Sequence, residues 1–212
     1  MPAPESPETE ERELPFSWTV LGFEFALALV AVFLGVTLGP DPRETIPPRT
    51  EAGEIGQAIG WGLLAAFPCF ALMWLAERLP LQPFRTLQTI VEERVAPLFL
   101  DLSLAEVIAI GLAAGVGEEL LFRGWFQSSL TGGDSATNLS IASGLIAASL
   151  LFGLCHWLTA AYGILATIMG LYLGGLLLWF DNLIVPITAH AFYDVLAILH
   201  LQRSHAKKVK QE

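Results

Sequence analysis

Ionisable residues stand at three places inside long apolar stretches of the sequence. The first place is GVGEELLFRGWFQ, which contains Glu118, Glu119 and Arg123. A charged side chain at the centre of a membrane helix costs about 2.5–3.5 kcal/mol on insertion scales, so we expect these residues to have a function. On a helix, Glu119 and Arg123 would share a face in the favourable acid-before-base order, which predicts an ion pair between them.

Glu118 lies about 100° around the same helix from Glu119 and has no predicted partner. We expect it to face the interior of a helix bundle, where a free carboxylate can act as a general base. In the alternative, the helix ends here and all three charged residues lie among the lipid headgroups, because charges at helix ends often snorkel.

Histidines mark the other two places. Phe152 and His156 are four residues apart in FGLCH, and His190 and Asp194 are four residues apart in HAFYD. A carboxylate at this spacing can orient the imidazole, or both groups can bind one ligand. Either histidine alone could instead make a structural hydrogen bond to a neighbouring helix. Taken together, imidazoles and carboxylates from three helices can bind a metal ion or position a hydrolytic water.

Six apolar segments could position these residues. Each is close to the length of about 20 residues that crosses a membrane, where the backbone must form helices to satisfy its own hydrogen bonds. With 54% hydrophobic residues among 212, the sequence predicts an all-α, polytopic transmembrane bundle with the catalytic core in its last four spans. The predicted spans are 18–38, 56–76, 102–126, 138–157, 162–180 and 183–201.

The connecting segments divide the chain further. Residues 77–100 predict a short amphipathic helix on the membrane surface. Its arginines and the basic C-terminal tail fall on the same side, which the positive-inside rule makes cytoplasmic. The predicted parts are a disordered acidic N-terminus (1–17), two spans with the amphipathic segment (18–100), the core (101–201) and the basic tail (202–212).

The charge, the first residues and the cysteines of the sequence argue against nucleic-acid-binding, organelle-targeted and disulfide-rich proteins. The net charge is −10, and without a basic patch we expect no nucleic-acid partner. The start of the chain does not resemble a signal or transit peptide, which favours the plasma membrane. Cys69 and Cys155 form no CxxC pair, so we expect two small buried thiols.

The segments EELLFR, FGLCH and HAFYD resemble the EExxxR, FxxxH and HxxxN/D motifs of the CPBP intramembrane proteases. This family includes CAAX-type prenyl-protein endopeptidases and bacteriocin-processing (Abi) enzymes. The order and spacing of the motifs agree over about residues 103–200. The resemblance implies an intramembrane endopeptidase, with a peptide or lipidated protein in the lipid bilayer as its substrate.

The resemblance also implies a role for each residue of the first two motifs. Glu118, together with His156, would activate the attacking water. Arg123 would hold Glu119 and its helix in register. Phe152 would shape the substrate pocket beside His156.

The third motif implies that His190 and Asp194 stabilise the tetrahedral oxyanion or bind a divalent metal such as zinc. Members of the family often have Asn at the position of Asp194. An amide can donate a hydrogen bond to an oxyanion and an ionised carboxylate cannot, so Asp194 fits better as an orienter of His190 or as a ligand. The residues predicted to ligate such a metal are Glu118, His156, His190 and Asp194.

Two other interpretations of the polar residues stay open. The chain could be a non-proteolytic membrane scaffold, maturation or bacteriocin-immunity protein, or a small transporter with a carboxylate proton relay. The predicted spans also place Glu118 near the outer end of the third and His156 near the inner end of the fourth. For the two to meet, a span must begin deeper or a connecting segment must re-enter the membrane. We expect Glu24 and Glu106, near span starts, to reach the interface.

Overall fold

The computed structural model describes residues 15–209, and this part of the chain folds into helices without any strand. Five helices are long and apolar enough to cross a membrane, and there are up to six spans if a bent helix pair counts as one. The predicted all-α, polytopic bundle is confirmed, and the protein is a multi-pass integral membrane protein. The five helices are α1 (Phe16–Leu38), α2 (Ala52–Ala76), α7 (Asn138–Cys155), α8 (Ala160–Phe180) and α9 (Ile184–Val209).

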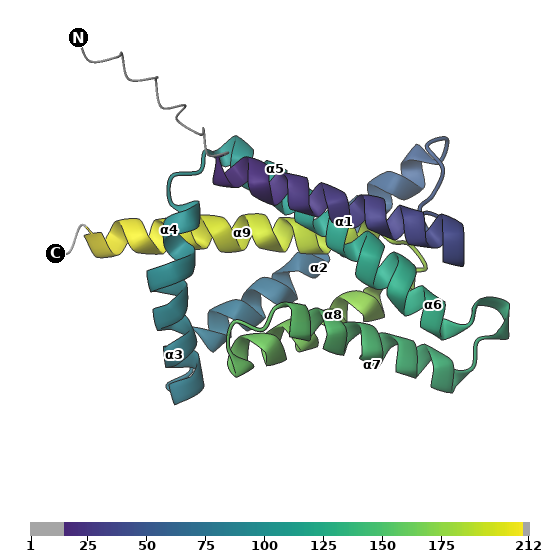
Figure 1. Ribbon diagram of the computed structural model, residues 1–212. Coiled ribbons are helices and arrows are strands. Elements are labelled where there is room, and N and C mark those ends of the chain that lie inside the picture. Colours follow the sequence, from purple (N-terminus) through teal and green to yellow (C-terminus); the bar gives the residue numbers. More distant parts are fainter. Residues whose placement is uncertain (1–14, 210–212) are drawn as a thin grey trace, which may run out of the picture.

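The bent pair joins a surface segment to the third span at an angle of 112°. In Figure 1, α3 and α4 run across the other helices at the end of the bundle where α1 begins and α9 ends. The predicted amphipathic segment is therefore helical and lies across the spans, as a membrane-surface helix does. The first arm comprises α3 (Gln82–Ile90), η1 (Val91–Val95) and α4 (Ala96–Phe99), and the second comprises α5 (Leu104–Glu119), η2 (Leu120–Gln127) and α6 (Ser128–Thr131).

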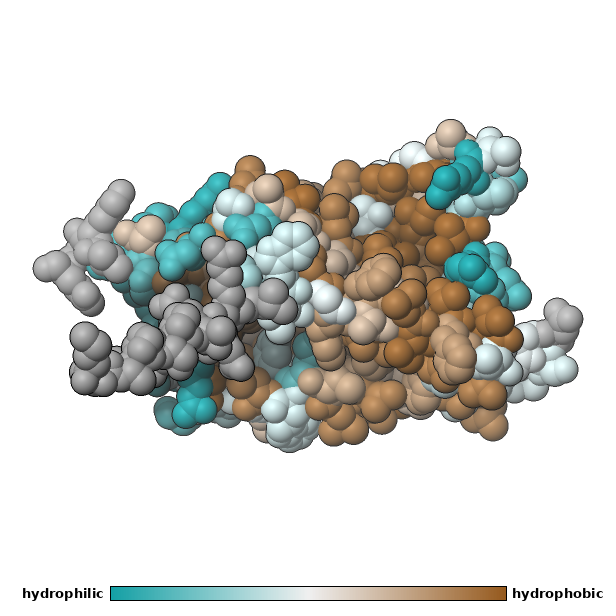
Figure 2. Space-filling view, turned by 45° about the horizontal axis from the view of Figure 1, so that its top comes forward, coloured by the Kyte–Doolittle hydropathy of each residue, from teal (hydrophilic) through white to brown (hydrophobic). Residues whose placement is uncertain are grey.

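The outer surface of the bundle suits a bilayer. Figure 2 shows apolar residues gathered across the middle of the molecule and hydrophilic residues at its two ends. Large apolar side chains such as Phe33 and Trp179 point outward, with 66% and 84% of their surface exposed. Because lipid is as apolar as these side chains, close packing of small residues, rather than burial of large ones, holds such helices together.

Small residues bring α5 and α9 into close contact. A Cβ atom at Gly115 would lie 2.7 Å from the carbonyl oxygen of Ile187, and one at Gly111 would lie 2.8 Å from that of Ala191. Both glycines therefore serve packing. The close approach carries the end of α5, with its two glutamates, onto the part of α9 that bears His190.

A second glycine pair packs α8 in the same way. A Cβ atom at Gly170 would lie 3.0 Å from the Cα of Ser149 on α7, and Gly174 faces the side chains of Gln127 and Leu145. The helices α7 and α8 are therefore close neighbours, and η2 lies within reach of both.

The third span is longer than predicted, which removes the difficulty over Glu118 and His156. The helix that begins at Leu104 continues through η2 and α6 to Thr131, so Glu118 lies in its middle rather than near its end. His156 is the residue at which α7 ends. The segment between Thr131 and α7 is a short turn, and re-entry of the connecting segment is not needed for the two side chains to meet.

The ends of the chain and the two cysteines agree only in part with the prediction. The helix α9 runs on to Val209, so the residues of the predicted basic tail from 202 to 209 are helical. Residues 1–14 and 210–212, which hold most of the predicted disordered N-terminus and the end of the tail, lie outside the described residues. Cys69 is buried as predicted, but Cys155 is exposed, because it lies on the outer face of the last turn of α7.

Candidate active site

The three polar clusters meet at one place in the bundle. The Oε2 atom of Glu118 lies 3.7 Å from Nε2 of His156 and 4.0 Å from Nε2 of His190. The Oδ2 atom of Asp194 lies 3.6 Å from the same nitrogen of His190. The middle of the third span, the end of α7 and the first half of α9 thus each contribute to one group of side chains.

The predicted ion pair between Glu119 and Arg123 is present in the structure. Oε1 of Glu119 lies 2.6 Å from Nη1 of Arg123, and neither side chain is exposed. The guanidinium carbon also lies 4.3 Å from the centre of the Phe152 ring, a distance at which the ring face attracts a cation. A buried charge is tolerated only with such partners, so the pair fixes this part of the third span.

Glu119 has a second partner that reasoning from one helix could not reveal. Its Oε1 atom lies 2.7 Å from Nδ1 of His190, which is 71 residues away in the chain. A carboxylate can only accept, so Nδ1 carries the proton and donates it. The opposite ring nitrogen, Nε2, is thereby turned toward Glu118 and Asp194, an arrangement by which an outer carboxylate orients a functional imidazole.

Phe152 holds the other imidazole. Its ring stacks on that of His156, with the ring centres 4.3 Å apart, and its carbonyl oxygen lies 2.9 Å from Nδ1 of His156. A carbonyl oxygen only accepts, so the proton is again on Nδ1 and Nε2 faces Glu118. Phe152 itself is 1% exposed and touches Phe122 edge-on, so the position of His156 is fixed by a buried residue.

Glu118 has an unpartnered oxygen that faces both imidazoles. Its Oε2 atom is buried and has no hydrogen-bond partner among the described residues. The side chains of His156 and Asp194 are each 25% exposed. The four side chains therefore pack together inside the bundle, and two of them are still partly exposed. A distance of 3.7 Å between two acceptors is one that a bridging water fits.

The sequence did not predict η2, the π-helical turn at Leu120–Gln127. Such turns are rare and occur often at functional sites. This one carries Arg123 and Gln127, both buried, whose side chains approach the carbonyl oxygens of Gly170 and Gly174 on α8. Gly170 and Gly174 could have indicated this contact from the sequence, because two glycines on one face of a helix leave space for large side chains of a neighbouring helix.

The expectation for Glu24 is wrong. It is 6% exposed in the structure, because it lies on the face of α1 that packs against α5. A Cβ atom at Gly117 would lie 3.1 Å from Oε2 of Glu24, so the carboxylate sits beside the backbone next to Glu118. Oε2 has no hydrogen-bond partner among the described residues. Glu106 does lie at the start of α5, where it forms a capping box with Ser103.

The predicted metal ligands have suitable chemistry but do not enclose an ion. Two imidazoles and two carboxylates are donors that zinc uses. Within residues 15–209, however, no group of three or more His, Cys, Asp or Glu side chains is arranged so that it could hold a metal ion. We therefore derive no step of the chemistry through a metal.

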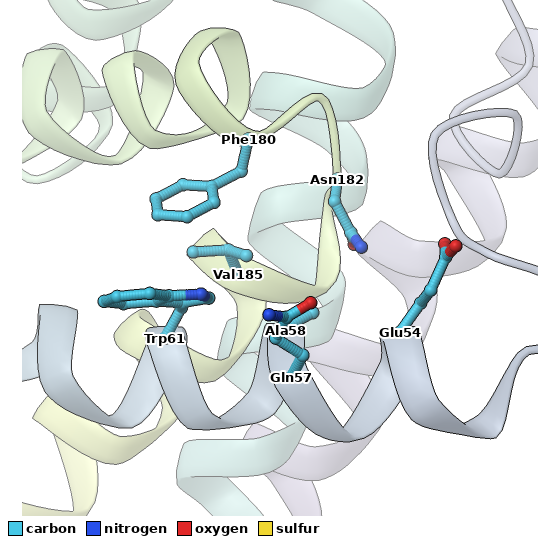
Figure 3. Close-up of a pocket in the computed structure, with 7 residues that line it drawn as sticks. All are labelled: Glu54, Gln57, Ala58, Trp61, Phe180, Asn182 and Val185. Atoms are coloured by element: carbon cyan, nitrogen blue, oxygen red, sulfur yellow. The ribbon is translucent and has the colours of Figure 1, made fainter.

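A pocket elsewhere in the bundle contains none of these residues. It lies between the first half of α2 and the turn from α8 to α9, where the rings of Trp61 and Phe180 lie side by side (Figure 3). Their centres are 5.8 Å apart, and Glu54, Gln57 and Asn182 line the polar end. Asn182 caps the start of α9 by accepting from the Ile184 amide at 2.9 Å, so this residue has a structural role.

Known proteins resemble the part of the chain that holds the site. Residues 100–196 match the family model described as type II CAAX prenyl endopeptidase Rce1-like. The chain is 29% identical over 121 residues to "Uncharacterized protein YpbD" of Bacillus subtilis (strain 168), a match covering 54% of this chain and 56% of that protein. The match therefore spans about half the length of this curated relative. No solved structure matches the chain.

Proposed function

Because residues 100–196 match the family model described as type II CAAX prenyl endopeptidase Rce1-like, we propose that the protein is an intramembrane endopeptidase. It hydrolyses a peptide bond in a membrane-associated substrate by means of a water that Glu118 and His156 activate. The observation that carries the proposal is the partnerless inward oxygen of Glu118, which lies 3.7 Å from Nε2 of His156.

The geometry gives the water two acceptors. A water between Glu118 and His156 donates one hydrogen to the carboxylate and the other to Nε2, and its lone pair is left for the carbonyl carbon of the substrate. Glu118 takes the proton as the water attacks. It then returns the proton to the nitrogen of the leaving amine, so the general base becomes the general acid of the second step.

His190 and Asp194 act on the carbonyl oxygen of the substrate. An imidazolium at His190 can donate from Nε2 to the oxyanion, while Nδ1 donates to Glu119. The carboxylate of Asp194, 3.6 Å from Nε2, stabilises the charge on that ring and holds its orientation. Arg123 and Phe152 do not touch the substrate; they keep Glu119 and His156 in place.

The substrate approaches from the bilayer in this proposal. Leu154 and Trp157, on either side of the turn at His156, are 61% and 57% exposed on the lipid-facing surface. A substrate with a prenyl group or an apolar segment partitions into the same layer. A prenylated CAAX-type peptide and a leader peptide both meet this requirement, so the first test uses both kinds.

The experiment compares three forms of the purified protein in detergent. Wild type, Glu118→Gln and Glu93→Gln are incubated with prenylated and unprenylated membrane peptides, and the products are identified by mass spectrometry. Glu93 is an exposed residue of the surface segment, so its variant controls for the loss of one negative charge. We expect cleavage by wild type and Glu93→Gln, and none by Glu118→Gln. Absence of cleavage by wild type would favour the scaffold or immunity function, and equal cleavage by all three forms would remove Glu118 from its role.

Addition of a chelator to the wild-type reaction tests the metal. Since the donors do not enclose an ion, we expect the rate to stay within about twofold of its value without chelator, well short of the tenfold loss that 1.4 kcal/mol represents. Loss of cleavage that zinc restores would instead assign Glu118, His156, His190 and Asp194 as ligands.

A further inference from the structure

In the proposed oxyanion site, the carboxylate of Asp194 stands where a second hydrogen-bond donor would stabilise the oxyanion. An ionised Asp194 accepts hydrogen bonds and cannot donate them. His190 then supplies a single donor from Nε2. Oxyanion sites commonly combine donors from several groups, tyrosine hydroxyls included, so another donor should face the same place.

Tyr162 stands beside this place, at the start of α8. Its ring centre lies 6.2 Å from that of His156, with the rings inclined at 62°. Thr159 caps α8 by accepting from the Tyr162 amide at 3.1 Å, so Tyr162 occupies the rigid first turn. Gly163 lets the Trp157 ring lie against the same turn, which holds the start of α8 close to His156.

The charges around Tyr162 point the same way. The carboxylates of Asp194 and Glu118 are the charged groups that act on its hydroxyl. Within residues 15–209 the Tyr162 hydroxyl makes no hydrogen bond, and the side-chain cap at this turn uses the Tyr162 backbone amide. The hydroxyl is therefore free to donate to a ligand beside His156.

We propose that the Tyr162 hydroxyl is a catalytic hydrogen-bond donor to the tetrahedral oxyanion. An ionised Asp194 cannot donate this hydrogen bond. This inference rests on the proposed endopeptidase function. The phenol stays neutral and exchanges no proton with the substrate. It strengthens one hydrogen bond as negative charge develops on the carbonyl oxygen, and so acts on the transition state more than on the bound substrate.

The test removes one oxygen atom and leaves the ring. Tyr162→Phe is compared with Tyr172→Phe, a matched variant on the same helix whose hydroxyl donates to the carbonyl oxygen of Ala65 at 3.0 Å. Cleavage of a prenylated peptide is followed by mass spectrometry at several concentrations. We expect kcat of Tyr162→Phe to fall about 10²-fold with KM unchanged, as for loss of one oxyanion donor, and Tyr172→Phe to keep the wild-type kcat.

A second variant tests the link to Asp194. Asp194→Asn puts an amide donor beside the oxyanion, so the loss of the Tyr162 hydroxyl should matter less there. We expect the kcat penalty of Tyr162→Phe to be at least about tenfold smaller in the Asp194→Asn background, a coupling of about 1.4 kcal/mol. Equal penalties in both backgrounds would overturn the assignment of Tyr162 to the oxyanion.

The possible results distinguish the role of Tyr162 from the proposed endopeptidase function. Cleavage by wild type and none by Glu118→Gln, with full kcat in Tyr162→Phe, would overturn the role of Tyr162 and leave the endopeptidase intact. A thermal melt of Tyr162→Phe that falls far below wild type, with the lost activity restored at low temperature, would make the residue structural. Failure of wild type to cleave would overturn both.

Discussion

At the scale of single residues, Glu119 stands between two partners of different kinds. Its Oε1 atom lies 2.6 Å from a guanidinium nitrogen of Arg123 and 2.7 Å from Nδ1 of His190. One buried carboxylate therefore neutralises a charge and orients an imidazole. Any change at Arg123 should disturb His190 as well, since the three groups share one oxygen.

The first prediction concerns this pair. Arg123→Gln leaves Glu119 buried without its counter-charge, and loss of one partner of a buried pair costs about 3–5 kcal/mol. We expect the free energy of unfolding in detergent to fall by that amount, measured by denaturant titration. Arg43→Gln is the control, because Arg43 and Asp41 form an exposed pair, and such pairs contribute little. Equal stability of both variants would contradict the account of the buried pair.

Glu24 gives a prediction of the opposite sign. Its Oε2 atom is buried without a hydrogen-bond partner in the described part of the chain, and an unsatisfied buried polar group costs about 1–3 kcal/mol. Glu24→Gln keeps the shape and replaces the carboxyl group by a neutral amide, which costs less to bury than a charge, so we expect the free energy of unfolding to rise by up to that amount. Glu106→Gln should lower it, because Glu106 accepts from the Ser103 amide at 2.9 Å. A loss of stability in Glu24→Gln would show that this carboxylate has a partner in the folded protein.

Some of the residue-level picture could be predicted from the sequence. The pairing of Glu119 with Arg123 and the freedom of Glu118 follow from helical geometry alone, because four residues make one turn. The contact from Glu119 to His190 could not be predicted, since it joins helices whose relative rotation no local pattern fixes. The burial of Glu24 was missed for the same reason: a charge near a span end is exposed or buried according to which face its helix packs.

At the scale of elements, the spans were predicted to within a few residues except where polar residues continue a helix. Serines and threonines after residue 126 indicated a loop, but the structure carries the helix to Thr131. The Ser128 hydroxyl donates to the Arg123 carbonyl at 3.0 Å, and that of Ser129 to the Trp125 carbonyl at 2.7 Å. Hydroxyls that bond back to the preceding turn satisfy themselves in an apolar layer, so composition alone does not end the helix.

The close approach of α5 and α9 gives a prediction for this scale. A Cβ atom at Gly115 would meet the Ile187 carbonyl at 2.7 Å, and overpacking of this kind costs about 1–3 kcal/mol. Gly115→Ala should therefore lower the melting temperature and the cleavage rate together, since it moves Glu118 away from His190. Gly175→Ala is the control, because nothing lies within 4 Å of its Cβ position. A stable and active Gly115→Ala would contradict the helix contact.

At the scale of the whole molecule, the surface segment found within residues 15–209 lies at one end of the bundle. The segment α3–α4 lies at the end where α1 begins and α9 ends (Figure 1), and Gln202 of α9 ties to it by donating to the Phe99 carbonyl at 2.8 Å. Hydropathy predicted six spans, the upper figure of the five or six that the structure allows. The even number of crossings between the surface segment and the basic tail predicted that both lie on the same side. Hydropathy could not predict which helices touch, because lipid-facing and buried faces are equally apolar and only the glycines mark the contacts.

Sidedness can be measured in cells. In a background with Cys69 and Cys155 replaced by Ser, we introduce Glu51→Cys in the loop before α2 and Arg94→Cys in the surface segment. If the positive-inside rule holds, a membrane-impermeant maleimide should label the first variant in intact cells and the second only after lysis. The reverse labelling pattern would place the start of α1, the end of α9 and the surface segment on the outside of the cell.

The most direct test of the account is the rate of Glu118→Gln on a peptide that the wild type cleaves, with both proteins reconstituted in lipid vesicles. The amide has the same shape but cannot take a proton from water, and general base catalysis contributes about 10²–10⁴-fold. We predict that kcat/KM falls by at least about 10²-fold while the melting temperature does not fall. A variant that cleaves as fast as the wild type would show that Glu118 does not activate the water, and the central claim would be wrong.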